Sequence, residues 1–312
     1  MQNFMIELEP VYTADKPELL QPREKLFRFD SPQSRYYFRF PAQGEEIAYI
    51  GATGATDRLL GISEGLVRWY AKNGELAYLM AKIAADYGTM MHVAIGDFEK
   101  AGRVVNFETI EELGFSTAMQ NGFPFAAPEW AFFLPRNLAS WIAFCQESEV
   151  EVLAVEFPVW SDTYSIATLC DIYCELTFNR KRKRAIINLK KGYLDDARAD
   201  ENKTFYDGSD LQLQIERLLW RECNPHLPVE MIFNWAPNNW TELPTYTLKN
   251  WTDKTRFDEE TLKRMLPLIR LVPGHFSPPK KVSVLNGTYK QGNDLSSNIR
   301  QIRMKAPKVT KS

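Results

Sequence analysis

Three runs of sequence decide the fold: VEVLAVEFPVW at 150–160, YSIATLCDIYCELTF at 164–178 and RAIINLKKG at 184–192. β-branched and aromatic residues fill these runs, and such residues favour strands. The polar segments WSDT and NRKRKR separate the runs and are typical of turns. The pattern predicts a three-stranded meander.

Helical and strand segments surround this meander. Residues 63–100 are rich in Ala, Leu, Met and Lys, which favour helices, with Ser63 as a candidate N-cap. Gly74 and Gly88 are expected to divide this run into separate helices. The segment NGFPFAAPEWAFF at 121–133 is expected to be an aromatic loop that packs on the core. The remaining predicted elements are two short strands within 25–50, a turn into a helix at 51–57, helices at 136–147, 209–222 (capped by Ser209 or Asp210) and 257–271, and strands at 230–237 and 245–251.

Length and charge set the general class of the protein. The 312 residues fit one elaborated domain, expected at 1–272 with an N-terminal β elaboration, and a flexible basic tail at 273–312. The net charge of -2 excludes a generally basic nucleic-acid binder, so any DNA contact must come from local patches. The start MQNFMIELEP has no basic leader followed by an apolar run, and no long uncharged apolar stretch occurs. We therefore expect no signal peptide, no membrane span and a cytoplasmic location.

The four cysteines are expected to be buried, reduced thiols. Their spacing fits neither a CxxC pair nor a disulfide framework. Cys170 and Cys174 are four residues apart in a strand-like run, so we expect them on one face of the sheet.

Polar residues able to build a reactive site recur in a set order along the chain. A predicted helix carries His92 within DYGTMMH, the second run of the meander carries Asp171, and the third carries Asn188 and Lys190. Asp171 and Asn188 can face each other across the hairpin, and Asn188 and Lys190 share a strand face because they are two residues apart. Taken alone, His92 is better explained as a core histidine. The order of the other elements favours a site instead.

The chemistry of these side chains suits a divalent cation. Oxygen ligands such as Asp171 and Asn188 prefer Mg²⁺ or Mn²⁺, and a histidine ligand suits Mn²⁺. A lysine such as Lys190 can offset negative charge in a phosphoryl transition state. An unpaired carboxylate in an apolar strand is costly, so Asp171 must have a partner.

The order of motifs resembles the RecB-like branch of the PD-(D/E)XK nuclease superfamily. That family has a GTxxH helix, a GxxD strand, a (D/E)xK strand and a QxxxY helix, and here GTMMH, TLCD, NLK and a glutamine-bearing helix occur in the same order over roughly 25–255. AADYGTMMH and NWAPNNWTELPTYTLKNWTD also look like a phage-associated group of these nucleases. The resemblance implies an α/β (α+β) fold with a restriction-endonuclease-like core, in which a central mixed sheet containing the meander is flanked by helices.

The resemblance also implies an activity and its residues. It implies a metal-dependent deoxyribonuclease of the exonuclease or recombination type, using Mg²⁺ or Mn²⁺, with DNA as partner and host cytoplasm as location if phage-encoded. Some relatives carry an iron–sulfur cluster held by four cysteines, but the cysteine spacing here predicts none. The implied catalytic residues are Asp171, Asn188, Lys190 and Gln212, and the implied metal ligands are His92, Glu156, Asp171 and Asn188. The run Arg180, Lys181, Arg182, Lys183 and Arg184 is either a solvated turn or a phosphate contact.

The chain departs from the family pattern at several positions. Asn188 stands where the family has an acid, and Thr168 stands where GxxD has its glycine. The tyrosine of QxxxY becomes Glu216 if Gln212 is the family glutamine, or leucine if it is Gln214. We expect Glu156 or Glu175 to compensate for the missing acid, and Asn188→Asp to raise a weak activity at least tenfold. The alternative is a catalytically inactive DNA-binding or scaffold protein on the same fold.

Overall fold

The structure is a computed structural model that describes residues 5–8, 11–12, 26–30, 35–39, 41, 47–61, 63–192, 205 and 208–271. The predicted tail at 273–312 lies outside these residues. The described strands are β1 (Met5–Leu8), β2 (Val11–Tyr12), β3 (Leu26–Asp30), β4 (Arg35–Arg39), β5 (Ile47–Gly51), β6 (Glu151–Ser161), β7 (Ile166–Phe178), β8 (Lys181–Leu189), β9 (Met231–Pro237) and β10 (Tyr246–Asn250). The described helices are α1 (Ala52–Leu60), α2 (Glu64–Asn73), α3 (Leu76–Lys100), α4 (Phe107–Gln120), α5 (Ala127–Glu147), α7 (Ser209–Cys223) and α8 (Glu259–Met265), with short 3-10 turns η2 (Pro124–Ala126) and η3 (Leu266–Leu271).

A mixed sheet forms the centre of the molecule. The described strands run in the order β1-β3-β4-β5-β7-β8-β9-β10, with β6 paired to β7 and β2 paired to β6. The predicted meander is confirmed, because β6, β7 and β8 pair antiparallel in sequence order. β5 pairs parallel with β7 and β9 pairs parallel with β8, so the sheet is mixed.

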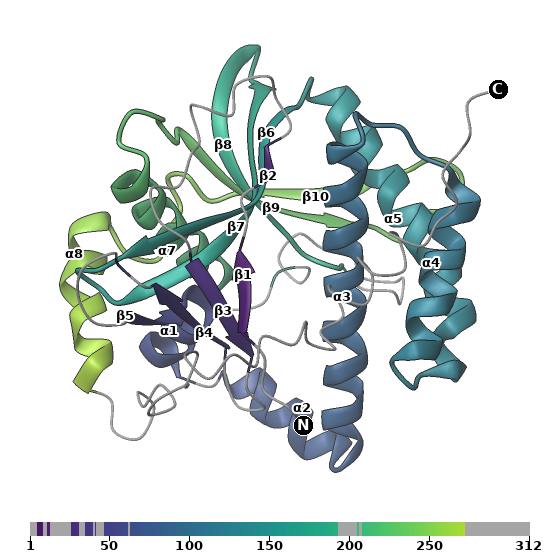
Figure 1. The fold of residues 1–312 in the computed structure, drawn as a ribbon, viewed down its shortest axis with the longest axis horizontal. Helices are drawn as coiled ribbons and strands as arrows, with labels where there is room; N and C mark the ends of the chain where they lie inside the picture. The colour runs from purple at the N-terminus through teal and green to yellow at the C-terminus, as the bar shows by residue number, and fades with distance from the viewer. Residues whose placement is uncertain are drawn as a thin grey trace.

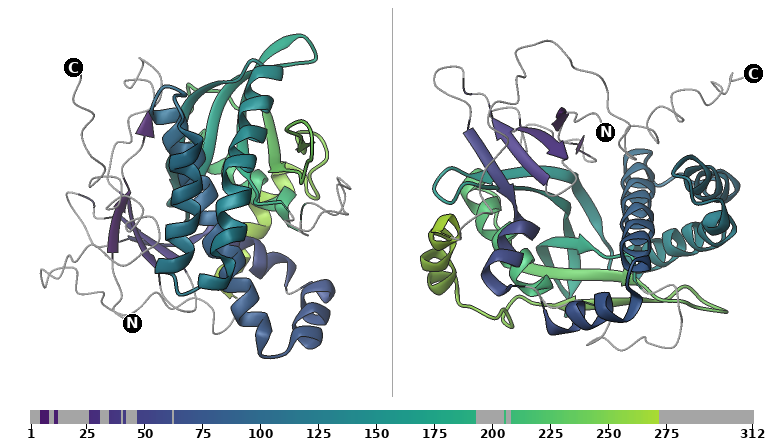
Figure 2. Two further views of the ribbon diagram at one scale, coloured as in Figure 1. Left: turned by 90° about the vertical axis from the view of Figure 1, so that its right-hand side faces the viewer. Right: turned by 90° about the horizontal axis from the view of Figure 1, so that it is seen from below.

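Helices cover both faces of this sheet, and each face has its own core. One layer contains α3, α4 and α5, and the other contains α7 with α1 and α8 (Figure 1 and Figure 2). Trp130, Trp141 and Phe233 are buried in the first core, whereas Trp220 and Ile232 are buried in the second. The sheet therefore lies between two buried apolar cores, and polar side chains gather near the end of β8.

Several predicted elements differ from the structure. Gly74 does end α2, with φ +54, but Gly88 lies inside the unbroken α3. A single helical glycine costs about 1 kcal/mol relative to alanine, and the burial of neighbouring Tyr87, Met90 and Met91 outweighs that cost. Tertiary packing therefore decides the length of this helix.

The predicted aromatic loop is largely helix. α5 begins at Ala127 and continues through Pro135, and α4 was not predicted at all. Trp130, Leu134 and Leu138 recur every four residues and are buried, so packing of one helix face overrides the break expected at proline. The predicted caps of α7 are also wrong, since the residue before the helix is Gly208 in a left-handed conformation.

The side-chain alternation along β7 breaks at one point. Cys170 packs in the core beside α7, but Ile172 and Cys174 pack in the core beside α3. Cys170 and Cys174 are therefore on opposite faces, and the prediction of a common face is wrong. The irregularity lies at Asp171, and on the adjacent strand β6 Glu156 has a left-handed backbone with φ +49. All four cysteines are free thiols; Cys145, Cys170 and Cys174 are buried as predicted, whereas Cys223 is only half-buried.

Candidate functional site

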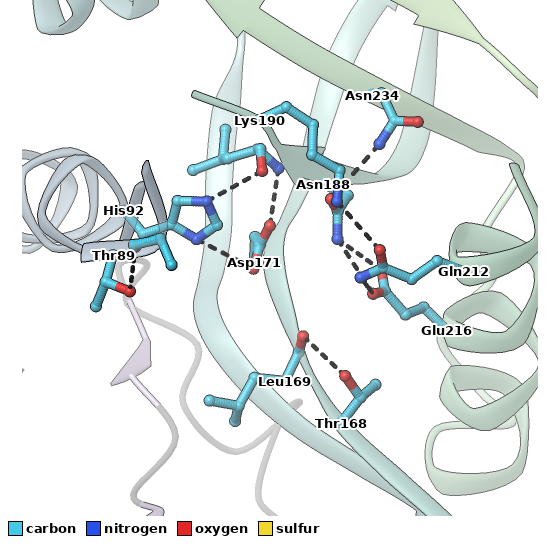
Figure 3. Close-up of polar contacts among 12 residues, drawn as sticks. Thr89, His92, Thr168, Leu169, Asp171, Asn188, Lys190, Gln212, Glu216 and Asn234 are labelled. Carbon is cyan, nitrogen blue, oxygen red and sulfur yellow. Dashed lines mark hydrogen bonds and ion pairs between the residues drawn. The ribbon is translucent and has the colours of Figure 1, made fainter. Parts of the chain in front are cut away.

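A gap in strand pairing positions Asp171. On the side of β7 opposite β6, β5 pairs with β7 only at 166–167, and β8 pairs with it only from 172 to 178. Between these two stretches, no strand of the described chain pairs with β7 on that side. The carboxylate of Asp171 lies in this gap, where β8 diverges from β7 (Figure 3).

Asp171 and His92 both contact the backbone of Leu189, the last residue of β8. The backbone N–H of Leu189 donates to Asp171 Oδ2 at 2.8 Å, and His92 Nε2 lies 3.0 Å from the carbonyl oxygen of Leu189. These two contacts replace the strand pairing that ends at Ile172 and Ile187. On the other edge of β8, the N–H of Lys190 still donates to the carbonyl of Trp235 at 2.8 Å. The end of β8 is therefore fixed from both sides.

The side chains of His92 and Asp171 also form an ion pair with each other. His92 Nδ1 lies 3.5 Å from Asp171 Oδ1. Burial lowers the pKa of His92, but the charge and hydrogen bond of Asp171 outweigh it and raise the pKa above 6.5. Burial likewise opposes ionisation of Asp171, but His92, Lys190 and the Leu189 N–H lower its pKa below 3.8. Each side chain therefore favours the charged form of the other.

A second polar group lies across β8, beneath α7. Asn188 Nδ2 donates to Glu216 Oε1 at 3.1 Å, and Gln212 Nε2 donates to the same oxygen at 2.9 Å. The Lys190 ammonium donates to Gln212 Oε1 at 3.1 Å. Figure 3 shows Asn188, Lys190, Gln212 and Glu216 converging on one another. Asn234 extends the group, because its amide lies 3.5 Å from Asn188 Oδ1.

Glu216 is an acid of this group that the motif order did not select. It is fully buried, one helical turn from Gln212 on α7. Burial raises its pKa most and the charge of Asp171 adds to this, whereas Lys190 and the amide donors lower it, leaving a pKa of about 8. In the sequence, the one sign of the contact between Gln212 and Glu216 is their four-residue spacing along the predicted helix.

The structure thus brings together most of the predicted site residues. His92, Asp171, Asn188, Lys190 and Gln212 come from α3, β7, α7 and the end of β8. They form two hydrogen-bonded groups on either side of β8, close enough for Lys190 and Asp171 to act electrostatically across it, and together with Glu216 we call them the strand-end cluster.

The two acids expected to compensate for Asn188 have different positions. Glu156 lies near enough for its charge to raise the pKa of His92, so it borders the cluster. Glu175 does not belong to the cluster, because it pairs with Arg184 at 2.8 Å and with Arg182 at 3.9 Å. The expectation that Glu175 shares a face with Asp171 is wrong, since the alternation along β7 breaks at Asp171.

The basic hairpin lies away from the cluster. Lys181 and Asn188 are seven residues apart on β8, which at 3.3 Å per residue is roughly 23 Å. Lys183 pairs with Glu230 in this segment, in addition to the pairs that Arg182 and Arg184 make with acids. At the tip, Arg180 and Lys181 have no ion pair among the described residues.

The donor set of the cluster suits a hard cation in chemistry, but not yet in geometry. Asp171 and Glu216 provide carboxylate oxygens, and Asn188 and Gln212 provide amide oxygens. In the described part of the chain, no three His, Cys, Asp or Glu side chains lie close enough together to hold a metal ion as they stand. Both ring nitrogens of His92 already face hydrogen-bond partners, so its expected role as a ligand requires it to release Leu189 or Asp171.

Comparison with known proteins adds no relative. No known family model matches this chain, and no curated protein matches it. Among the residues that the structure describes, no helix has the length and apolar character needed to cross a membrane. Functional inference therefore rests on the strand-end cluster.

Proposed function

We propose that this protein is a metal-dependent nuclease that hydrolyses phosphodiester bonds in DNA, on a restriction-endonuclease-like core. One observation carries the proposal: the residues that the RecB-like motif order selects from α3, β7, β8 and α7 meet in a single cluster. These residues lie up to 120 residues apart in the sequence, from His92 to Gln212, and an accidental motif match gives them no reason to meet.

The chain's own residues suit this chemistry. Asp171 is held ionised by His92 and fixed by the Leu189 N–H, so its carboxylate stays charged and in place. Gln212 holds the Lys190 ammonium at the end of β8, where a cation can offset the charge that develops on a phosphate. A bound Mg²⁺ or Mn²⁺ would be held by Asp171 with other oxygens of the cluster, and would supply a water of lowered pKa and a polarised phosphate.

The test is cleavage of end-labelled DNA in Mg²⁺ and in Mn²⁺. Lys190→Ala should lower the rate by roughly 10²- to 10³-fold, the usual cost of removing one donor that stabilises a transition state. Lys183→Ala is the matched control, because Lys183 lies on β8, the strand that ends beside Lys190, but pairs with Glu230 outside the cluster. Equal rates for the two variants would contradict a catalytic role for Lys190.

One observation favours a second candidate, a catalytically inactive DNA-binding or scaffold protein. Asn188 is neutral and turns its amide N–H toward Glu216, so position 188 itself offers no negative charge to a metal. In this case the wild-type chain binds DNA but cuts it in neither metal. DNA binding without cleavage would therefore support this second candidate and contradict the nuclease proposal.

A further inference from the structure

The acid missing from position 188 has a counterpart in direct contact with it. Gln212 lies in the cluster, whereas Gln214 donates to the carbonyl of Phe257. With Gln212 as the motif glutamine, the chain departs from the RecB-like pattern at two positions of the cluster, with Asn188 in place of an acid and Glu216 in place of a tyrosine. These two side chains touch, because Asn188 Nδ2 lies 3.1 and 3.4 Å from the carboxylate oxygens of Glu216. When Glu216 is ionised, the pair carries one negative charge, the same charge that an ionised acid at 188 would supply.

The surroundings of Glu216 are unusual for a structural acid. The side chain is fully buried, and its hydrogen bonds in the described structure come from the neutral amides of Asn188 and Gln212. The nearest cation, Lys190, donates to Gln212 rather than to Glu216. Burying a carboxylate without a directly bonded cation is costly. A cation bound beside Glu216 would therefore stabilise the ionised form of this carboxyl, which burial otherwise disfavours.

We propose that Glu216 supplies the second carboxylate of the divalent-cation site, so that the acid has moved from strand β8 to helix α7 while the site keeps two carboxylates with Asp171. This inference rests on the proposed function. It assigns to Asn188 the role of an amide that orients Glu216, and it removes the need for Glu156 or Glu175 to replace the missing acid.

The geometry permits this exchange because β8 and α7 approach the cluster from opposite sides. Asn188 points from the strand toward the helix, and Glu216 points from the helix toward the strand (Figure 3). Their functional groups therefore share one location, and a carboxylate reaches it from either element. Asp171 lies close enough to Glu216 for its negative charge to raise the pKa of the Glu216 carboxyl.

The experiment titrates the full chain with Mn²⁺. Isothermal calorimetry and the spin-resonance signal of free Mn²⁺ both measure the binding. Glu216→Gln, which keeps the side-chain size, should weaken Mn²⁺ binding at least tenfold. The double variant Asn188→Asp with Glu216→Gln returns the acid to β8, and its affinity should recover to within about threefold of wild type. Glu175→Gln is the control, because Glu175 pairs with arginines outside the cluster, and it should bind Mn²⁺ as wild type does.

The outcomes separate this inference from the proposed function. Unchanged Mn²⁺ affinity in Glu216→Gln, or no recovery in the folded double variant, overturns the role of Glu216. If Asp171→Asn abolishes Mn²⁺ binding and cleavage while Glu216→Gln affects neither, the nuclease proposal stands and only this inference fails. If wild type neither binds Mn²⁺ nor cuts DNA, both fail. Circular dichroism of each variant excludes loss of fold as the cause of weakened binding.

Discussion

The buried carboxyl of Glu216 predicts an unusual pH dependence of stability. Its pKa is about 8 in the folded protein, against an ordinary value of 4.5, mainly because burial disfavours the charged form and Asp171 adds to this. The folded state therefore holds the proton more tightly than the unfolded chain does. Because the folded state then binds more protons, the free energy of unfolding decreases as pH rises from about 4.5 to about 8.

The magnitude follows from the two pKa values. A tenfold difference in proton affinity is worth about 1.4 kcal/mol, so the shift from 4.5 to about 8 corresponds to a loss on the order of 5 kcal/mol across that pH range. His92 acts in the same direction above its ordinary pKa of 6.5, since its pKa is also raised. Asp171 acts at lower pH, because its pKa is lowered below 3.8.

The assay is urea unfolding at pH 5, 6, 7 and 8 with a chelator present, for wild type and Glu216→Gln. The variant has no carboxyl at this position, so its free energy of unfolding should change much less between pH 5 and pH 8. The contribution of His92 remains in both proteins and largely cancels in the comparison. Curves that stay parallel within about 0.5 kcal/mol over this range would refute the buried, protonated state of Glu216.

Three further predictions concern the contact of His92 with the strand end, the packing at two helical glycines and the tip of the basic hairpin. His92→Gln should lower the free energy of unfolding by about 1–3 kcal/mol, because it removes a charged partner of the strand end, and chemical denaturation at pH 6 measures this. Gly114→Ala should destabilise by about 1–3 kcal/mol or more, since the added Cβ would lie 2.6 Å from a backbone oxygen of the facing helix. Gly65→Ala, with nothing within 4 Å of its Cβ, should instead stabilise by about 0.5–1 kcal/mol, and thermal melts of the two variants that matched in sign would contradict the packing argument. Replacing Arg180 and Lys181 with alanine should reduce the slope of log affinity for duplex DNA against log salt by about 2 if both contact phosphates, and an unchanged slope would remove the hairpin tip from the interface.

The structure also changes the expectation for Asn188→Asp. The sequence predicts a gain of activity from restoring the family acid. In the structure the new carboxylate would lie in contact with Glu216, where the amide of Asn188 now donates at 3.1 Å. Two carboxylates at this distance repel each other or share a proton. We therefore expect no gain from Asn188→Asp alone. With Glu216→Gln added, the activity should return to about the wild-type level, and a comparison of the two single variants with the double variant measures this.

The sequence by itself determined the elements with strong, local patterns. The meander of β6, β7 and β8 was predictable because β-branched residues and basic or polar turns alternate along it, and α7 was predictable from its helical spacing. The order of motifs also selected His92, Asp171, Asn188, Lys190 and Gln212, which the structure brings into one cluster. These features depend on residue type and short spacing, which a single chain displays directly.

Only the tertiary structure decided at which residues helix packing or strand pairing overrides the local sequence pattern. α4 and the continuation of α5 through Pro135 depend on burial of Trp130 and its neighbours, which no local signal shows. The alternation of β7 changes at Asp171, where β5 and β8 pair with different parts of β7 and leave a gap between them. Cys170 and Cys174 consequently pack in different cores. The contact between Asn188 and Glu216 joins positions 28 residues apart on a strand and a helix, and only their packing shows that the acid missing from one is present on the other.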